Sequence, residues 1–153
     1  MIVNTAYIYM GVGGGGGGGG ETPVNPNLWQ DGVSNYPVVF TNKSSISPDG
    51  LELTHYGGSA TFSELQLTGF NSLTISLKPN TKLFNSVNIK IEFLNSTGQL
   101  LGTETAKFEA NYGTESPPQT VNIPSSAKIQ NAKIKITDTS KNIDVTLSSA
   151  LLS

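Results

Sequence analysis

Apolar and polar residues alternate strictly in five segments of the chain. A period of two places successive side chains on opposite faces of a strand, so each segment is predicted to form a strand with one buried and one solvated face. Strands of this kind are typical of antiparallel sheets. The five segments are 51–56, 73–78, 87–93, 133–137 and 143–148.

Turn-forming residues separate these segments, and shorter runs of β-favouring residues lie between them. The turns are expected at 47–50, 68–71, 95–98 and 138–142, and the further strands at 36–41, 60–67, 100–109 and 120–123. No segment has a sustained helical period, and only 125–131 is predicted to form a single helical turn. The pattern predicts an all-β fold with a single antiparallel jelly-roll or β-sandwich domain.

The N-terminal part of the chain departs from this alternation because it contains eight consecutive glycines. Glycine loses more backbone freedom on ordering than any other residue, and a glycine run has no side chains to bury. It is interpreted either as a flexible connection or as a bundle of polyproline-II-like helices from several chains. The expected parts are an anchoring segment at 1–12, a spacer at 13–22 that includes Gly13, Gly16 and Gly20, and a β-sandwich head at 23–153.

The anchoring segment contains β-branched and aromatic residues and no charged side chain. It is expected to add a strand to the sheet edge of a partner protein, with main-chain hydrogen bonds giving affinity. The alternative is a frayed terminus. It lacks Lys and Arg, and its apolar run is short, so neither a secretion signal nor a membrane span is predicted. The expected anchoring residues are Ile2, Val3, Tyr7, Ile8, Tyr9 and Met10.

Composition narrows the classes of partner. The formal net charge is −2, and the chain has nine Lys and no Arg. Without the guanidinium group, the commonest bidentate contact to phosphate and guanine is missing, which disfavours nucleic-acid binding. Cysteine is absent, which excludes disulfides and thiolate metal sites. Solubility rests on hydroxyl and amide groups, since only 13% of residues are charged.

Residues with catalytic potential are few. The only histidine, His55, is interpreted as a core or edge residue, and one histidine with scattered carboxylates does not make a zinc site. Glu92 and Glu104 lie on adjacent predicted strands, and such a pair could cleave glycosides. We instead interpret them as solvated charges near Lys90 and Lys107. The sequence therefore predicts a protein that is not an enzyme and has no catalytic residues.

Two further sets of residues have binding potential. Asp31, Asp49 and Asp138 lie in predicted loops, where jelly rolls can hold structural calcium, but their spacing matches no regular calcium motif. No other cofactor is expected. Exposed aromatic rings stack on sugars, although such rings often close the ends of small sandwiches instead. The candidate glycan-binding residues are Trp29, Tyr36, Tyr56 and Tyr112.

Two stretches resemble known proteins. Residues 1–11, followed by polyglycine, resemble the N-termini of small bacteriophage virion proteins, whose leader attaches them to a capsid or tail. Residues 67–77, Leu-Thr-Gly-Phe-Asn-Ser-Leu-Thr-Ile-Ser-Leu, resemble a segment of carbohydrate-binding-module-like jelly rolls, a fold recurrent in phage fibres and decoration proteins. The resemblance implies a position on the virion surface and multimerisation. If the glycines form a bundle of polyproline-II-like helices, three-fold packing favours a homotrimer.

These expectations combine into one leading interpretation. The chain would be a non-enzymatic structural protein of a phage particle, attached to other virion proteins through residues 1–12. Its head would decorate the surface or bind host glycans weakly in many copies. The alternative is a bacterial carbohydrate-binding module or surface adhesin domain. No membrane partner is expected.

Overall fold

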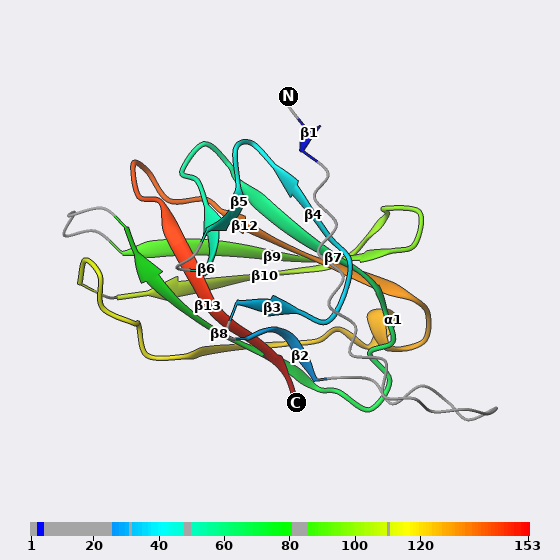
Figure 1. Cartoon of the computed structure of the whole chain (residues 1–153). Coiled ribbons are helices and arrows are strands. Elements are labelled where there is room, and N and C mark those ends of the chain that lie inside the picture. The colour runs from blue at the N-terminus through cyan, green and yellow to red at the C-terminus, as the bar shows by residue number, and fades with distance from the viewer. Residues whose placement is uncertain (1–2, 5–25, 31, 48–49, 81–85, 110) are drawn as a thin grey trace.

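Two antiparallel sheets stacked on each other form the body of the protein (Figure 1). The computed structural model describes residues 3–4, 26–30, 32–47, 50–80, 86–109 and 111–153. The first sheet has the order β1 (Val3–Asn4), β4 (Val38–Thr41), β7 (Ser59–Leu65), β12 (Ala132–Asp138), β9 (Val87–Asn95) and β10 (Leu100–Phe108). The second has the order β11 (Gln119–Asn122), β8 (Ser72–Pro79), β13 (Val145–Leu152), β2 (Asn27–Gln30) and β3 (Val33–Ser34).

Two short strands and one helical turn complete the fold. Strand β6 (Gly50–Leu53) pairs with β13, and β5 (Ser45–Ser47) pairs with β6. The turn α1 (Ser125–Lys128) lies within the segment predicted to form one. It is the one helix of the residues described, and it is too short and polar to cross a membrane.

The core lies between the two sheets and contains the apolar half of each alternating segment. In β9, for example, Val87, Ile89, Ile91 and Phe93 are buried, while the residues between them are partly exposed. Fully burying one such side chain contributes roughly 1.5–3 kcal/mol. Four strands of the first sheet each contribute one buried phenylalanine ring to this core: Phe40, Phe62, Phe93 and Phe108.

The predicted all-β sandwich is therefore confirmed, and each of the nine expected head strands is present, as β4 and β6 to β13. Strand β13 continues past the expected end at residue 148. Its pairing with β8 shifts register between Leu147 and Ser149. Odd-numbered residues such as Val145 and Leu147 face inward before the shift, and Ala150 and Leu152 face inward after it. A bulge of this kind interrupts the alternation without ending the strand.

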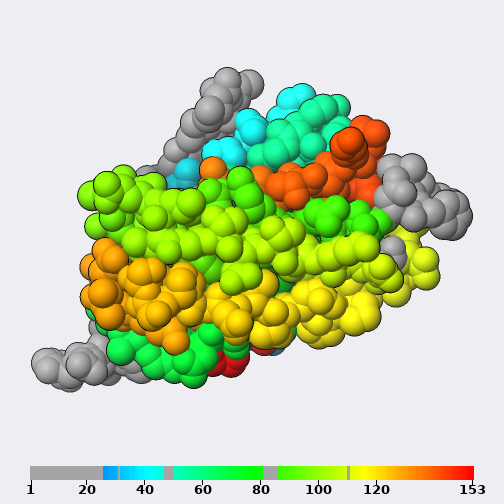
Figure 2. Space-filling model, turned by 180° about the vertical axis from the view of Figure 1, so that it is seen from behind, coloured from blue at the N-terminus to red at the C-terminus, as the bar shows by residue number. Residues whose placement is uncertain are grey.

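The open side of the sandwich is closed by the chain that follows β10. Figure 2 shows β10 and the connection leading to α1 lying side by side across this face. The two segments approach closely at Gly102, where an added Cβ atom would come within 2.8 Å of the Pro124 side chain.

The N-terminal strand pairs differently from the sequence-based expectation. Val3 lies opposite Thr41, and Asn4 lies opposite Phe40, so β1 extends the protein's own first sheet. Val3 thus pairs within its own chain in this structure, and its expected pairing with the sheet of a partner stays a prediction. The other expected anchoring and spacer residues lie outside the described part: Ile2, Tyr7, Ile8, Tyr9, Met10, Gly13, Gly16 and Gly20.

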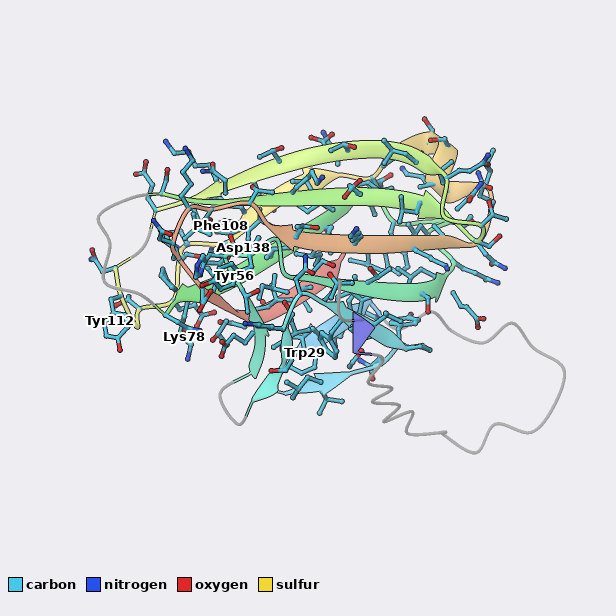
Figure 3. All side chains as sticks on the ribbon, turned by 90° about the horizontal axis from the view of Figure 1, so that it is seen from above. Trp29, Tyr56, Lys78, Phe108, Tyr112 and Asp138 are labelled. Carbon is cyan, nitrogen blue, oxygen red and sulfur yellow. The ribbon has the colours of Figure 1, made fainter. Side chains whose placement is uncertain are left out.

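The strand registers define two ends of the sandwich. One end carries the start of β7, the end of β8 and the end of β12, and Figure 3 shows Tyr56, Tyr112, Lys78 and Asp138 lying toward it. We call it the tyrosine end. The opposite end carries the turn between β9 and β10 and the α1 turn.

Candidate functional site

Trp29 does not offer a surface to a ligand. It lies on β2, its side chain is 0% exposed, and its indole Nε1 donates a hydrogen bond to the Leu147 carbonyl oxygen at 3.0 Å. Both the ring and its polar nitrogen are therefore satisfied inside the sandwich. The expectation of glycan binding is wrong for this residue, and the packing alternative applies.

Tyr36 also lies away from the tyrosine end. It is half-buried against the core just before β4, where the neighbouring Pro37 carbonyl accepts a hydrogen bond from the Ser63 N–H at 3.1 Å. Val38 pairs with Phe62 at that end of the sheet, whereas Thr41 pairs with Ser59 at the tyrosine end. Tyr36 is thus separated from the tyrosine end, where Tyr56 and Tyr112 lie, by the length of β4.

The loop that carries Tyr112 is attached to the end of β8 through its main chain. The Gly113 N–H donates to the Pro79 carbonyl oxygen at 3.0 Å, and the Ser116 N–H donates to the Leu77 carbonyl oxygen at 2.8 Å. Gly113 has a φ of 69°, a conformation that glycine adopts without strain. These contacts hold the Tyr112 side chain, 53% exposed, at the rim of the sandwich.

Beside Tyr112 lies a surface hollow of about 420 Å³. Its floor is formed by three neighbouring strands on which Glu52, Thr146 and Lys78 are in register: Thr146 lies opposite Glu52 on one side and opposite Lys78 on the other. Strands in a sheet are about 4.8 Å apart, which separates the Glu52 and Lys78 backbones by roughly 10 Å. The lining residues are Glu52, Lys78, Pro79, Asn80, Tyr112, Gly113 and Thr146.

The charges in this hollow have no partner among the residues that the structure describes. The ion pairs among the described residues join His55 to Asp144, Lys90 to Glu92 and Lys107 to Glu109. Glu52 and Lys78 enter none of them and form no side-chain hydrogen bond within the part of the chain that the structure describes. A carboxylate and an ammonium group therefore face the same hollow, both free to bind a polar ligand.

Asn80 sits at the edge of the hollow in a fixed position. Its side-chain amide and the Thr146 hydroxyl exchange hydrogen bonds at 2.8 and 3.0 Å. Its backbone N–H donates to the Asp144 carbonyl oxygen at 2.7 Å. The end of β8 is thereby tied to the start of β13.

The second exposed tyrosine of this end, Tyr56, follows β6 and is 64% exposed. Its ring lies against the His55 ring, with centroids 3.9 Å apart at 37°, and the Lys43 Nζ is 5.6 Å from the Tyr56 centroid. The Asn42 side-chain amide donates to the carbonyl oxygens of Tyr56 and Gly57 at 3.3 and 3.2 Å. The turn is thus fixed, although much of the ring is in solvent.

His55 connects this turn to the rest of the tyrosine end. Its ring Nδ1 lies 2.8 Å from Asp144 Oδ1, and its backbone N–H donates to the same oxygen at 2.7 Å. The histidine is half-buried at the end of the sandwich, in agreement with the edge position expected from the sequence. One carboxylate oxygen therefore joins the turn after β6 to the residue before β13.

Asp138 lies behind this contact and is buried. Its Oδ1 accepts a hydrogen bond from the Ser140 N–H at 2.8 Å, while its Oδ2 has no hydrogen-bond partner. Burial raises the pKa of Asp138 from 3.8 to about 6; the nearby Asp144 charge adds to the rise, and the hydrogen bonds from Ser140 oppose it. Asp138 is the candidate calcium ligand that falls within the described residues.

The described residues do not fit a calcium ion at Asp138. Calcium takes six to eight oxygen ligands, usually including several carboxylates. Within the described ranges, no group of three or more His, Asp or Glu side chains is placed to hold a metal. The other two loop aspartates, Asp31 and Asp49, lie outside these ranges.

The carboxylate pair considered for glycoside cleavage is not assembled. On adjacent strands β9 and β10, Glu92 lies opposite Thr103, whereas Glu104 lies opposite the buried Ile91. Residues directly opposite each other share a face, so Glu92 and Glu104 are on opposite faces of the sheet. Glu92 instead pairs with Lys90 at 3.3 Å.

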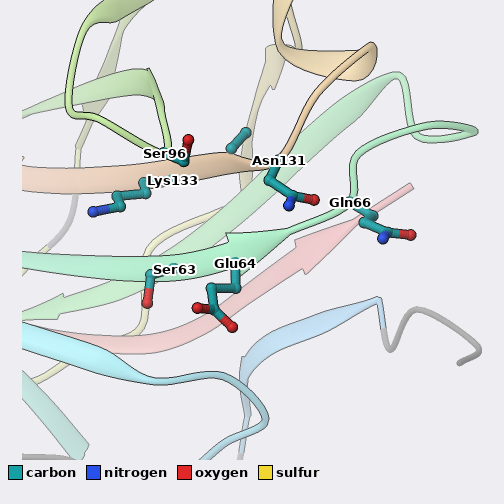
Figure 4. Close-up of a pocket in the computed structure, with 7 residues that line it drawn as sticks. Ser63, Glu64, Gln66, Ser96, Asn131 and Lys133 are labelled. Carbon is teal, nitrogen blue, oxygen red and sulfur yellow. The ribbon is translucent and has the colours of Figure 1, made fainter.

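A second hollow, of about 430 Å³, lies at the opposite end of the sandwich (Figure 4). Its lining is polar and contains no aromatic ring: Ser63, Glu64, Gln66, Ser96, Asn131, Ala132 and Lys133. Glu64 has a φ of 60°, beside the register shift between β7 and β12. This hollow offers hydrogen bonds but no flat apolar surface.

The alternation of apolar and polar residues predicts only part of the lining of the first hollow. It places Glu52, Lys78 and Thr146 at solvated positions of three strands. It does not reveal that these strands are neighbours, because β6, β8 and β13 are far apart in the chain. These residues and Asn80 were therefore missing from the sequence-based candidates.

Comparison with known protein families gives no match, and comparison with curated proteins gives none either. Solved structures with the same fold do exist. The carbohydrate-binding module CBM36 in complex with calcium and xylotriose superposes with a TM-score of 0.53 and 17% identity, covering 78% of this chain and 94% of that module. The chain shares the β-sandwich fold of carbohydrate-binding modules.

Two larger proteins contain a similar region. One is a glycoside hydrolase family 43 arabinoxylan arabinofuranohydrolase from Bacillus subtilis, with a TM-score of 0.54, 12% identity and 87% of this chain covered. The other is the Agl-KA catalytic domain, with a TM-score of 0.52, 9% identity and 84% covered. The chain spans only 28% of each of these two proteins. The likeness is therefore to a part of each, and it concerns the fold.

Proposed function

We propose that the protein is a non-enzymatic carbohydrate-binding module whose tyrosine end holds a short stretch of a glycan. The observation that carries this proposal is the exposed Tyr112 ring beside a hollow containing the unpaired Glu52 and Lys78. The fold comparison supports it, since a module of this fold has been solved with xylotriose.

The chemistry of the hollow suits a sugar. One face of a pyranose presents C–H groups that pack on an aromatic ring, and its hydroxyls both donate and accept hydrogen bonds. Glu52 supplies an acceptor and Lys78 a donor, on either side of Thr146. A volume of about 420 Å³ lies within the range of small-molecule sites and suits a short oligosaccharide.

The hollow is suited to binding without turnover. Glycoside hydrolysis uses two carboxylates flanking the bond that breaks. The lining of this hollow contains one carboxylate, that of Glu52. We therefore expect the protein to retain bound oligosaccharides unchanged.

The test measures binding by the full chain to xylotriose and to a panel of plant and bacterial polysaccharides, using calorimetry and affinity electrophoresis. Tyr112→Ala removes the ring and is expected to weaken binding roughly tenfold, which corresponds to about 1.4 kcal/mol. Tyr112→Phe keeps the ring and should retain most of the affinity. Lys78→Ala should weaken binding, whereas Lys133→Ala, in the other hollow, is the matched control and should not.

Each outcome has a definite meaning. Loss of binding in Lys133→Ala, with Lys78→Ala and Tyr112→Ala unaffected, would assign the glycan to the opposite end. No binding to any polysaccharide in the panel would refute the proposal.

The fold comparison favours the carbohydrate-binding alternative over a purely structural role in a virus particle. A position on a phage particle remains a proposal for residues 1–12 and rests on the resemblance of that segment to virion leaders. On a particle, many copies would add avidity to a weak site. Unchanged copy number in purified particles after deletion of residues 1–12 would refute the anchoring role of that segment.

A further inference from the structure

The outer edge of β4 receives a strand that comes from far along the chain. Val3 and Asn4 of β1 pair antiparallel with Thr41 and Phe40, and residues 5–25 connect β1 to the head. The contact is therefore made by main-chain pairing across a long connection. This is the geometry of strand addition to a sheet edge.

Strand β4 is a firm template for such an addition. Four of its residues pair with β7, and its inward-facing Val38 and Phe40 are buried in the core. On the outward face, the Thr41 and Ser59 hydroxyls are 2.5 Å apart, which ties β4 further to β7. Without β1, β4 would be the edge of the first sheet and would present unpaired N–H and C=O groups, which attract strands from other chains.

The length of the connection permits the strand to come from another copy. The 21 residues from 5 to 25 reach up to about 70 Å when fully extended. A head of this size has a radius of gyration of about 14 Å. The connection can therefore extend well beyond its own head to the β4 edge of a neighbour.

We infer that the β4 edge, Val38–Thr41, is a docking site for the N-terminal strand of a second copy of this chain. Exchange of identical strands preserves each Val3–Thr41 and Asn4–Phe40 pairing and only changes which copy supplies it. The partner is thus chemically the same uncharged, β-favouring segment that pairs within one chain. The expected product is a closed oligomer in which every β4 edge is filled.

Concentration decides between self-pairing and exchange. Connection through the chain holds a copy's own strand near the edge at an effective concentration that is at most on the order of mM. Exchange therefore prevails where heads are held close together, as in a concentrated solution or on a multivalent surface. In dilute solution, the self-paired form is favoured.

The absence of cysteine from the chain allows a direct test by disulfide trapping. Val3 and Thr41 are directly opposite, a separation that a disulfide can bridge in an antiparallel pair. Neither Val3→Cys nor Thr41→Cys can form the 3–41 bridge within one chain. The two full-length variants, with different tags, are mixed at high concentration, unfolded, refolded together and oxidised. We expect a disulfide-linked heterodimer on a non-reducing gel.

Two further samples make the result decisive. The double variant Val3→Cys/Thr41→Cys should form a 3–41 bridge and thereby verifies the pairing itself. Val3→Cys mixed with Thr103→Cys, an exposed position on the far-edge strand β10, measures random collision. A heterodimer yield no higher than in the Thr103 mixture, together with a bridged monomer of the double variant, would overturn the exchange. A double variant that forms no 3–41 bridge at all would overturn the docking site.

Discussion

The buried carboxyl group of Asp138 is expected to make the protein less stable as the pH rises. The pKa of Asp138 is about 6 in the folded protein and 3.8 in its ordinary state. The folded state thus binds more protons than the unfolded state between these two values. The stabilising contribution of Asp138 is therefore fully present below pH 3.8 and is lost as the pH rises through about 6.

The size of this effect on the unfolding free energy follows from the same two pKa values. A pKa difference of roughly 2 units corresponds to about 3 kcal/mol, because one unit is worth 1.36 kcal/mol. At pH 7, Asp138 is ionised inside the protein with one oxygen unpartnered. Asp138→Asn removes the charge and keeps an oxygen to accept the Ser140 N–H. We expect this variant to be more stable at pH 7, with about 3 kcal/mol as the upper limit, since burying the polar amide also has a cost.

The assay is urea unfolding between pH 4 and 7.5, followed by the fluorescence of Trp29, which is the only tryptophan and is buried. The difference in unfolding free energy between Asp138→Asn and the wild type should grow with pH through this range and level off near pH 7. Glu109→Gln, which neutralises an exposed carboxylate, serves as the control. Parallel pH profiles for the wild type and Asp138→Asn would refute the reasoning.

Two more expectations concern the core and metal binding. Trp29→Phe removes the donor to the Leu147 carbonyl and should lower the unfolding free energy by about 1–3 kcal/mol, measured by circular dichroism; an unchanged value would mean that the hydrogen bond contributes nothing. EDTA tests the calcium expectation for the loop aspartates: a fall in the thermal midpoint or in glycan binding would show that calcium is bound, and unchanged values would refute it.

Local patterns in the sequence were sufficient to predict nine strands of the head, β4 and β6 to β13, but not the short strands β2, β3 and β5. Segment 87–93 alternates because it lies between the core and solvent, and it forms part of β9. Strand β2 was not predicted, because Leu28 and Trp29 are adjacent and both buried, which breaks the alternation. The end of β13 was missed for a related reason, because the bulge changes which residues of the strand face the core.

The candidate site depends on pairing between distant strands, which local patterns do not contain. Tyr56 and Tyr112 were among the candidate glycan-binding residues, but only the fold shows that both are exposed and lie at one end. Glu52 and Lys78 face one hollow because each pairs beside Thr146. Glu92 and Glu104 were considered as a pair because their strands are neighbours. The register of these strands places the two side chains on different faces of the sheet.

The way in which the Tyr112 loop is attached has a consequence for how binding preference can change over time. Gly113 and Ser116 hold the loop through backbone atoms, which are present whatever side chain occupies position 112. A mutation there can replace the phenol with an indole, an imidazole or an amide while these two main-chain hydrogen bonds remain. New ligand preferences can therefore be sampled by single substitutions at this one position while the scaffold remains folded.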